Sequence, residues 1–426
     1  MKTSHGGWRC RILAGLCLIL VATAARAAFR DAHDNPPIGW TGKVFKLSQS
    51  YPATLPSAGS HPWTAFDFKN PAQAPKYMKA VIDYCLAGNT SSVMEDNFAD
   101  VGHNTVRKWY HAPWLDDGAK GREFIHGLTS ERPSRAGELG LLQVNQHDNW
   151  AVGIYNARGG YTIGQVWKDP LHPDPRLATF PLHTVSCKFL FTTTPVSEAP
   201  YLADSLEWQV DINRASGNGA RPKVRLLQVD IAVRAPFAAS PIGWVFGTFQ
   251  YEKAASSSTH WQDHLVPVGL MWGNDVPKLL ANQPPTTVWI NPARGEKLHL
   301  GFRNQLLDGP IDNPHASCTA CHGLAQINRT NSPPDKLPPR PTKDTLTAAQ
   351  IQAFFRDIKA REPFSANYVS VDYSLQLQLG IANAVKHGGA RLPAAIGTAT
   401  TITHAAGAAP SEAATKIQTI SRGGRH

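Results

Sequence analysis

The chain has 426 residues, and its 42 Lys and Arg outnumber its 32 Asp and Glu to give a formal net charge of +10. A hydrophobic fraction of 42% is that of a globular protein and not of a disordered chain. The positive charge is not gathered into Lys/Arg blocks, which argues against a nucleic-acid-binding protein. Charged residues make up only 17%, while Gly and Pro number 34 and 33, and this balance favours strands and turns over long surface helices.

Residues 1–27 have the parts of a secretory signal peptide. A basic start is followed by the apolar residues 12–21 and by Ala-Arg-Ala at residues 25–27, a small-x-small cleavage site. The apolar run is shorter than the ~20 residues that span a bilayer, and no later run is apolar enough to do so. We therefore expect cleavage after residue 27, a periplasmic location, and no membrane span in the mature protein.

Residues 28–300 are predicted to form a mainly β body, either a sandwich or a barrel-like sheet. Short runs rich in β-branched and aromatic residues, several of them alternating with period two, are separated by turn signals at residues 157–160 and 216–219. The expected strands are residues 185–194, 207–212, 223–234, 243–251, 286–290 and 297–303. The main early helix is expected at residues 72–87.

Two further features of this body bear on function. The aromatic side chains Trp109, Tyr110 and Trp114, where exposed, would suit a bound carbohydrate or another ligand. Cys85 and Cys187 are left as an isolated pair after removal of the signal peptide. In an oxidising compartment they form either a disulfide or two buried thiols, and the sequence leaves both open.

Residues 318–322 read Cys-Thr-Ala-Cys-His, the C-x-x-C-H pattern of haem c attachment. Two thiols that add to the two vinyl groups of one haem must lie on one turn, and the imidazole that follows then reaches the iron. We predict one covalent haem c, held by Cys318 and Cys321 with His322 as the proximal ligand.

Three other sites could use this spacing. A thioredoxin-like redox pair would normally follow a strand, whereas Asn-Pro-His-Ala-Ser precedes the motif at residues 313–317. A zinc site would need a second ligand pair, and Cys85 and Cys187 are isolated. A disulfide across two intervening residues is strained. The attachment of haem is favoured over all three.

About residues 311–360 resemble the start of a class I cytochrome c domain. Pro333 and Pro334 lie where that family has a proline whose carbonyl accepts a hydrogen bond from the proximal His, and the resemblance implies this role for one of them. Residues 346–351 resemble the opening of the family's last helix.

The residues of that last helix support the resemblance independently. Thr347 and Gln350 form a capping box, and apolar residues follow at helical spacing. A second helix is expected at residues 373–387. The sequence thus predicts a small α-helical haem-binding region at residues 301–395, followed by a disordered tail at 396–426.

The sixth iron ligand departs from the family pattern. Class I domains supply a methionine after the motif, and this chain has no Met beyond His322. Met271, His387 and His315 are the candidates, and an open iron site is the alternative. Candidates to pair with the haem propionates are Arg107, Lys108 and Arg303.

Three functions are consistent with these features. The leading hypothesis is an exported c-type haem protein that exchanges single electrons with a redox partner protein or a small donor or acceptor. The second is a haem enzyme with an open iron site that acts on peroxide, hydroxylamine or NO, by analogy with β-rich, five-coordinate c-type haem proteins whose motif follows most of the strands. The third is a ligand-binding β module with the haem as a relay.

Overall fold

A computed structural model describes most of the chain between residues 47 and 393. The described residues are 47–57, 59–88, 104, 106–115, 117–118, 121–122, 128–210, 223–294, 300–328 and 340–393. The expected signal peptide, the expected tail and Pro333 and Pro334 lie outside these ranges. No helix in the described ranges is long and apolar enough to cross a membrane.

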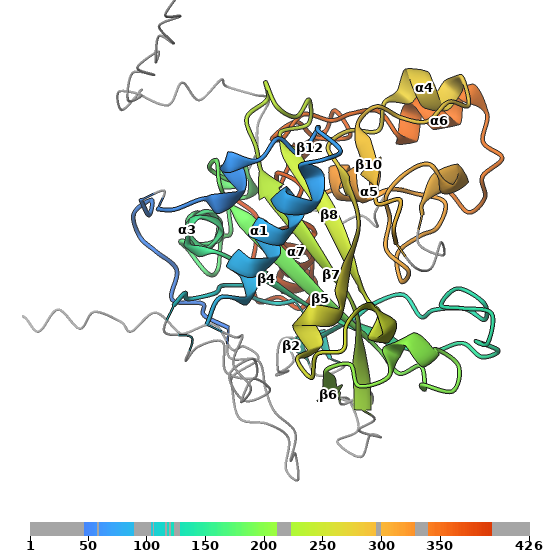
Figure 1. The fold of residues 1–426 in the computed structure, drawn as a ribbon. Coiled ribbons are helices and arrows are strands. Elements are labelled where there is room, and N and C mark those ends of the chain that lie inside the picture. The colour runs from blue at the N-terminus through green and yellow to red at the C-terminus, as the bar shows by residue number, and fades with distance from the viewer. Residues whose placement is uncertain are drawn as a thin grey trace, which may run out of the picture.

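The body is built on one antiparallel sheet of eight strands (Figure 1). The strands run in the order β10-β9-β8-β7-β5-β4-β3, and β6 pairs with one end of β7. Their bounds are β3 (Thr129–Ser130), β4 (Asn149–Tyr155), β5 (Val185–Thr192), β6 (Glu207–Gln209), β7 (Lys223–Arg234), β8 (Trp244–Tyr251), β9 (Leu265–Met271) and β10 (Val288–Ile290). The prediction of a mainly β body is confirmed. The eight strands of the body form one open sheet, however, and not a sandwich or a closed barrel.

Helices and two small sheets surround this main sheet. The α-helices are α1 (Ala74–Leu86), α3 (Ala157–Val166), α4 (Val276–Leu280), α5 (Cys318–Gly323), α6 (Ala348–Phe354) and α7 (Leu375–Lys386). Single 3-10 turns are η1 (Pro62–Ala65), η3 (Pro175–Leu177), η4 (Pro200–Leu202), η5 (Lys253–Ala255), η6 (Trp261–His264) and η7 (Phe302–Asn304). The two-stranded sheets are β1 (Asp117–Gly118) with β2 (Gly121–Arg122), and β11 (Gln326–Asn328) with β12 (Tyr368–Ser370).

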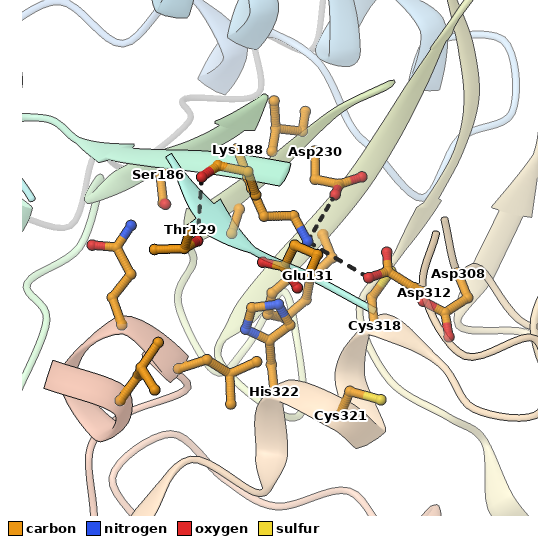
Figure 2. A pocket seen from close by; sticks show the side chains of 18 of the residues that line it. Thr129, Glu131, Ser186, Lys188, Asp230, Asp308, Asp312, Cys318, Cys321 and His322 are labelled. Atoms are coloured by element: carbon orange, nitrogen blue, oxygen red, sulfur yellow. Dashed lines mark hydrogen bonds and ion pairs between the residues drawn. The ribbon is translucent and has the colours of Figure 1, made fainter. Parts of the chain in front are cut away.

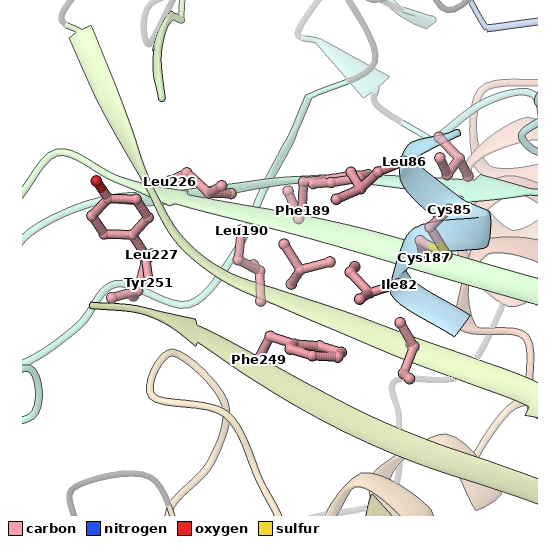
Figure 3. Packing of buried hydrophobic residues seen from close by; sticks show 14 of the residues in the cluster. Ile82, Cys85, Leu86, Cys187, Phe189, Leu190, Leu226, Leu227, Phe249 and Tyr251 are labelled. Carbon is pink, nitrogen blue, oxygen red and sulfur yellow. A yellow bond between two sulfur atoms is a disulfide. The ribbon is translucent and has the colours of Figure 1, made fainter. Parts of the chain in front are cut away.

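Helix α1 covers one face of the main sheet. Alternate residues of β5 point to this face, and there Phe189 belongs to the same buried cluster as Ile82 and Leu86 of α1 (Figure 3). A disulfide between Cys85 and Cys187 joins α1 to β5. The structure thus decides the question that the sequence left open, because packing of α1 on β5 brings the two cysteines together.

The opposite face of the sheet carries α7 and the motif helix α5. Tyr155 of β4 and Phe246 of β8 share a buried cluster with Leu377 and Ile381 of α7. Because side chains alternate along a strand, Lys188 of β5 points to this face and away from α1. The segment after residue 300 therefore shares a hydrophobic core with the sheet.

Residues 157–160 were expected to form a turn and instead form the first turn of α3. Asn156 caps this helix by accepting a hydrogen bond from the backbone N–H of Gly159. A Cβ atom at Gly160 would lie 2.6 Å from the ring of Tyr110, so glycine allows the helix to approach a buried aromatic side chain. The glycine pair serves close packing here, and this requirement is not visible in the local sequence.

The remaining local predictions differ in outcome. The helices expected at residues 72–87 and 373–387 are observed as α1 and α7, and the capping box of Thr347 and Gln350 begins α6 as predicted. In the expected strand at 297–303, the described residues form one isolated bridge at Leu300 and the turn η7. Strands β4 and β9 were not predicted.

Candidate functional site

Helix α5 carries the whole C-x-x-C-H motif. Its first turn is fixed by Ser317, whose Oγ accepts a hydrogen bond from the N–H of Ala320 at 3.0 Å and donates one to Asn274 at 2.6 Å. Cys318 and Cys321 are not joined in a disulfide. One short helix therefore presents two free thiols and the imidazole of His322 on a fixed backbone.

The imidazole of His322 has one nitrogen engaged and one left for another partner. Its Nδ1 lies 2.9 Å from the carbonyl oxygen of Tyr373. A carbonyl can only accept, so Nδ1 carries the hydrogen and Nε2 keeps the lone pair that a metal ion needs. Burial lowers the pKa of His322 to about 4, which keeps the ring neutral at physiological pH.

The carbonyl of Tyr373 is aimed by an unusual backbone turn. Asp372 and Tyr373 both have positive φ values, of 50° and 67°, in a region that favours glycine. The buried carboxylate of Asp372 accepts hydrogen bonds from the N–H of Phe180 at 2.7 Å and from Nε1 of Trp244 at 3.2 Å. These bonds hold a conformation that otherwise costs about 1–3 kcal/mol per residue.

Within the described residues, Tyr373 has the role that the resemblance implied for Pro333 or Pro334. The two prolines lie outside those residues. Tyr373 was not identified from the sequence, because nothing in the local pattern links it to a histidine far upstream. Only the packing of the segment after β12 against α5 brings its carbonyl to Nδ1.

A cavity lies where α5, α7 and the main sheet meet. The space between its walls is about 1130 Å³ when the open mouth is included. Cys318, Cys321 and His322 all line it. Figure 2 shows the His322 ring extending from α5 toward Glu131 and Lys188 on the sheet side.

The sheet side of the cavity carries a fixed ion-pair cluster. Lys188 and Asp230 are directly paired residues of β5 and β7, and Nζ of Lys188 lies 3.3 Å from a carboxylate oxygen of Asp230. The same Nζ lies 3.6 Å from a carboxylate oxygen of Asp312 (Figure 2). The three side chains keep 19–28% of their surface exposed although they lie within the fold, because they face the cavity.

The surrounding carboxylates keep Lys188 charged. Burial opposes its charge, but Asp312, Asp230 and Glu131 outweigh this effect and raise its pKa well above the usual range. Asp230 is itself held in place, because it accepts hydrogen bonds from Thr248 at 2.8 Å and from Nε2 of Gln228 at 3.0 Å. Lys188 is thus a charged ammonium group held in place on the sheet side of the cavity.

A further acid, Asp308, lines the cavity, and part of its carboxyl group has no hydrogen-bond partner among the described residues. Its side chain is 2% exposed, and one oxygen accepts a hydrogen bond from the N–H of Gly309 at 3.1 Å. The other oxygen has no hydrogen-bond partner among the described residues. Burial, together with the nearby charge of Asp312, raises the pKa of Asp308 well above its usual value and so favours the protonated form of the group.

None of the three sixth-ligand candidates lines the cavity. Met271 does not face the cavity but is buried in a cluster with Cys321, where its sulfur accepts a hydrogen bond from Oγ1 of Thr319 at 3.5 Å. His315 pairs with Asp344 at 2.9 Å, and His387 ends α7 as its C-cap. The structure therefore gathers the motif residues and leaves these three elsewhere.

The other candidate residues also lie away from the cavity. Arg107 stacks on the ring of Tyr84, with 3.4 Å between guanidinium and ring centre, and Arg303 donates a hydrogen bond to the carbonyl of Leu279. Lys108 lies 5.7 Å from the centre of a tyrosine ring. Arg340 lines the cavity instead. It was not among the predicted residues.

The aromatic residues proposed for ligand binding are mostly buried. Trp109 and Tyr110 are 1% and 6% exposed, and Trp114 packs against a buried cluster. The expectation that they form an exposed binding surface is wrong, because the first two pack against the sheet and its helices.

The chain matches no protein-family model, no curated protein and no solved structure. The chemistry of the site is therefore inferred from its own residues.

Proposed function

We propose that the protein binds one haem c covalently through Cys318 and Cys321, with His322 as an axial ligand, and that it is an exported redox enzyme acting on a small molecule. The main support is a single cavity lined by two free thiols and by an imidazole whose Nδ1 is already engaged. The residues present fit the cofactor, because Nε2 of His322 is left for iron and Arg340 on the cavity wall can pair with a propionate.

The bound haem would supply an iron that takes up and releases single electrons. The chain's own residues would do the rest. Tyr373 holds the tautomer and orientation of His322, and the apolar ring of Phe246 lies 4.8 Å from the imidazole ring and limits access of water. Electrons would arrive one at a time from a redox partner protein or a small donor.

The charged wall favours an enzyme over a protein that only transfers electrons. A simple electron carrier needs an iron with both axial sites filled and a shielded, apolar surrounding. Here the described wall of the cavity holds Lys188, Asp230 and Asp308 and none of the three candidate sixth ligands. Charged and acidic side chains of this kind stabilise a bound ligand and transfer protons in catalysis.

The disulfide supports the proposed periplasmic location. Disulfides persist in oxidising compartments and are rare in the cytosol, and the Cys85–Cys187 bridge agrees with the signal peptide expected at residues 1–27.

The test is to produce the chain in a periplasm that has a haem-attachment system. We expect a red protein whose denatured chain keeps the mass of one haem. The double substitution of Cys318 and Cys321 by Ala should abolish the added mass. His387→Ala, at a histidine outside the cavity, serves as the control and should keep it. A colourless wild-type protein of unmodified mass would contradict the proposal.

The same sample separates an enzyme from an electron carrier. An iron with an open coordination site changes its visible spectrum on addition of CO to the reduced protein or cyanide to the oxidised one. We expect both changes. A low-spin spectrum that neither ligand alters would favour single-electron transfer as the whole function.

A further inference from the structure

We infer that the cavity is a peroxide-reducing site in which Lys188 and Asp308 act on the bound oxygen atoms. This inference rests on the proposed haem. It assigns a substrate class to the cavity and names two residues that the C-x-x-C-H motif does not contain.

The three small ligands that suit an open haem iron differ in their need for protons. Reductive cleavage of an O–O bond consumes protons, oxidation of hydroxylamine releases them, and binding of NO requires none. A site for the first reaction therefore needs groups that carry protons at neutral pH, while a site for the second needs proton acceptors. On the cavity wall, Lys188 and Asp308 are the groups that favour the first reaction.

Lys188 has an N–H group to spare. An ammonium has three N–H donors, and among the described residues Nζ of Lys188 forms ion pairs with two carboxylates, those of Asp230 and Asp312, at 3.3 and 3.6 Å. Thr248 and Gln228 fix Asp230, so the lysine cannot easily turn away. The third N–H can then donate a hydrogen bond to an atom in the cavity. A preorganised cation of this kind stabilises negative charge that develops on an oxygen.

Asp308 provides an independent observation that points to a ligand. Asp308 lines the cavity, and one oxygen of its buried carboxyl group has no hydrogen-bond partner among the described residues. An unpaired buried polar atom costs about 1–3 kcal/mol, and such atoms are rare in native proteins unless a ligand or water satisfies them. The raised pKa of Asp308 favours the protonated form, and a protonated carboxyl group suits a general acid.

The reaction balances with a one-electron donor as the co-reactant. Hydrogen peroxide takes up two electrons and two protons, its O–O bond breaks, and two molecules of water form. Asp308 gives a proton to the leaving oxygen and regains one from solvent through the mouth of the cavity. Lys188 keeps its proton and stabilises the leaving oxygen through a hydrogen bond. The electrons come singly from a reduced redox protein or dye.

The first test measures ligand binding to the oxidised protein, without turnover. Fluoride accepts hydrogen bonds when bound to ferric haem, whereas imidazole binds mainly through its nitrogen. Lys188→Met should weaken fluoride binding about 10- to 100-fold, the worth of one charged hydrogen bond, and change imidazole binding less than about 3-fold. The matched control is Lys223→Met, an exposed lysine of β7 that pairs with Glu207 at 2.8 Å. Its affinities should equal those of wild type.

The second test measures turnover with a reduced dye. Wild-type protein should consume hydrogen peroxide, and Asp308→Asn should lower kcat about 100-fold or more because an amide cannot serve as the acid. Its spectrum and fluoride affinity should stay near those of wild type. This variant also tests the inference if Lys188→Met fails to fold.

The outcomes separate this inference from the proposed function. Wild-type protein without covalent haem would overturn both. A haem protein that oxidises hydroxylamine but does not reduce peroxide would overturn this inference alone. So would equal fluoride affinities of wild type and Lys188→Met, or full peroxide turnover by Asp308→Asn.

Discussion

At the scale of single residues, a backbone carbonyl sets the state of His322. Metal-binding histidines commonly donate their second ring N–H to a carbonyl or carboxylate, which fixes the tautomer and makes the ligand more basic. In this protein the acceptor is Tyr373, in a turn of two left-handed residues held by Asp372. The conformation is unfavourable by itself and persists because Phe180 and Trp244 bond to the Asp372 carboxylate.

This arrangement predicts that Asp372 controls the reduction potential of the haem. In Asp372→Asn one of the two accepting oxygens becomes a donor, so the turn loosens and the bond from His322 to Tyr373 weakens. A less basic imidazole stabilises ferric iron less, and the potential should rise by roughly 30–60 mV, where about 59 mV corresponds to a tenfold change for one electron. Spectroelectrochemical titration measures it. Asp169→Asn, at an exposed residue, is the control, and an equal rise in both variants would refute the assignment.

Asp308 predicts a pH dependence of stability. Its pKa is higher in the folded than in the unfolded state, so between those two pKa values the folded protein binds more protons. The free energy of unfolding contributed by this group therefore falls as pH rises through that window. Wild type should lose stability relative to Asp308→Asn in urea titrations as the pH rises above about 4, the pKa of an unperturbed Asp. A difference between the two proteins that does not change with pH would contradict this.

At the scale of elements, the disulfide joins a helix to the middle of the sheet. Cys85 and Cys187 are 102 positions apart in the sequence, so the bridge removes much of the freedom of the unfolded chain. On the folded side, α1 and β5 already pack through an apolar cluster (Figure 3). The bridge therefore adds stability to a contact that exists without it.

We expect replacement of Cys85 and Cys187 by Ala to lower the free energy of unfolding by about 2–5 kcal/mol, with little change in the visible spectrum. Urea unfolding followed by circular dichroism gives the value. Thioether bonds to haem resist dithiothreitol, so the reductant should bring wild type close to the variant and leave the variant unchanged. Equal stability of wild type and variant without reductant would show that the bridge contributes nothing.

At the scale of the whole molecule, the cavity is assembled from segments that are distant in the sequence. Lys188 and Asp230 come from the sheet, Asp308 and Asp312 from the loop before α5, and the thiols from α5 itself. The expected boundary at residue 300 separates these groups along the chain. In the fold, the segments on its two sides share buried clusters and line one cavity. The charged residues of the sheet and the C-x-x-C-H motif face the same cavity only because the segments that carry them pack together.

The local sequence was enough to predict the features that depend on near neighbours. Strand β7 has the bounds expected for it, because its alternation is continuous over its length, and α1 and α7 are close to their expected ranges. The capping box of α6 was also correct. The C-x-x-C-H spacing places Cys318 and Cys321 on one turn of helix, as the haem prediction requires, since a turn involves only residues that follow one another.

Which distant groups meet depends on the folding of the whole chain. It paired Lys188 with Asp312 and Cys85 with Cys187, brought the carbonyl of Tyr373 to His322, and buried aromatic residues that were expected to be exposed. Lys188 lies between Cys187 and Phe189, which indicates a polar face on an otherwise apolar strand. Which residue pairs with Lys188 depends on strand order and helix packing. Strand order and helix packing result from the burial of apolar surface over the whole chain, and no local pattern of residues predicts them.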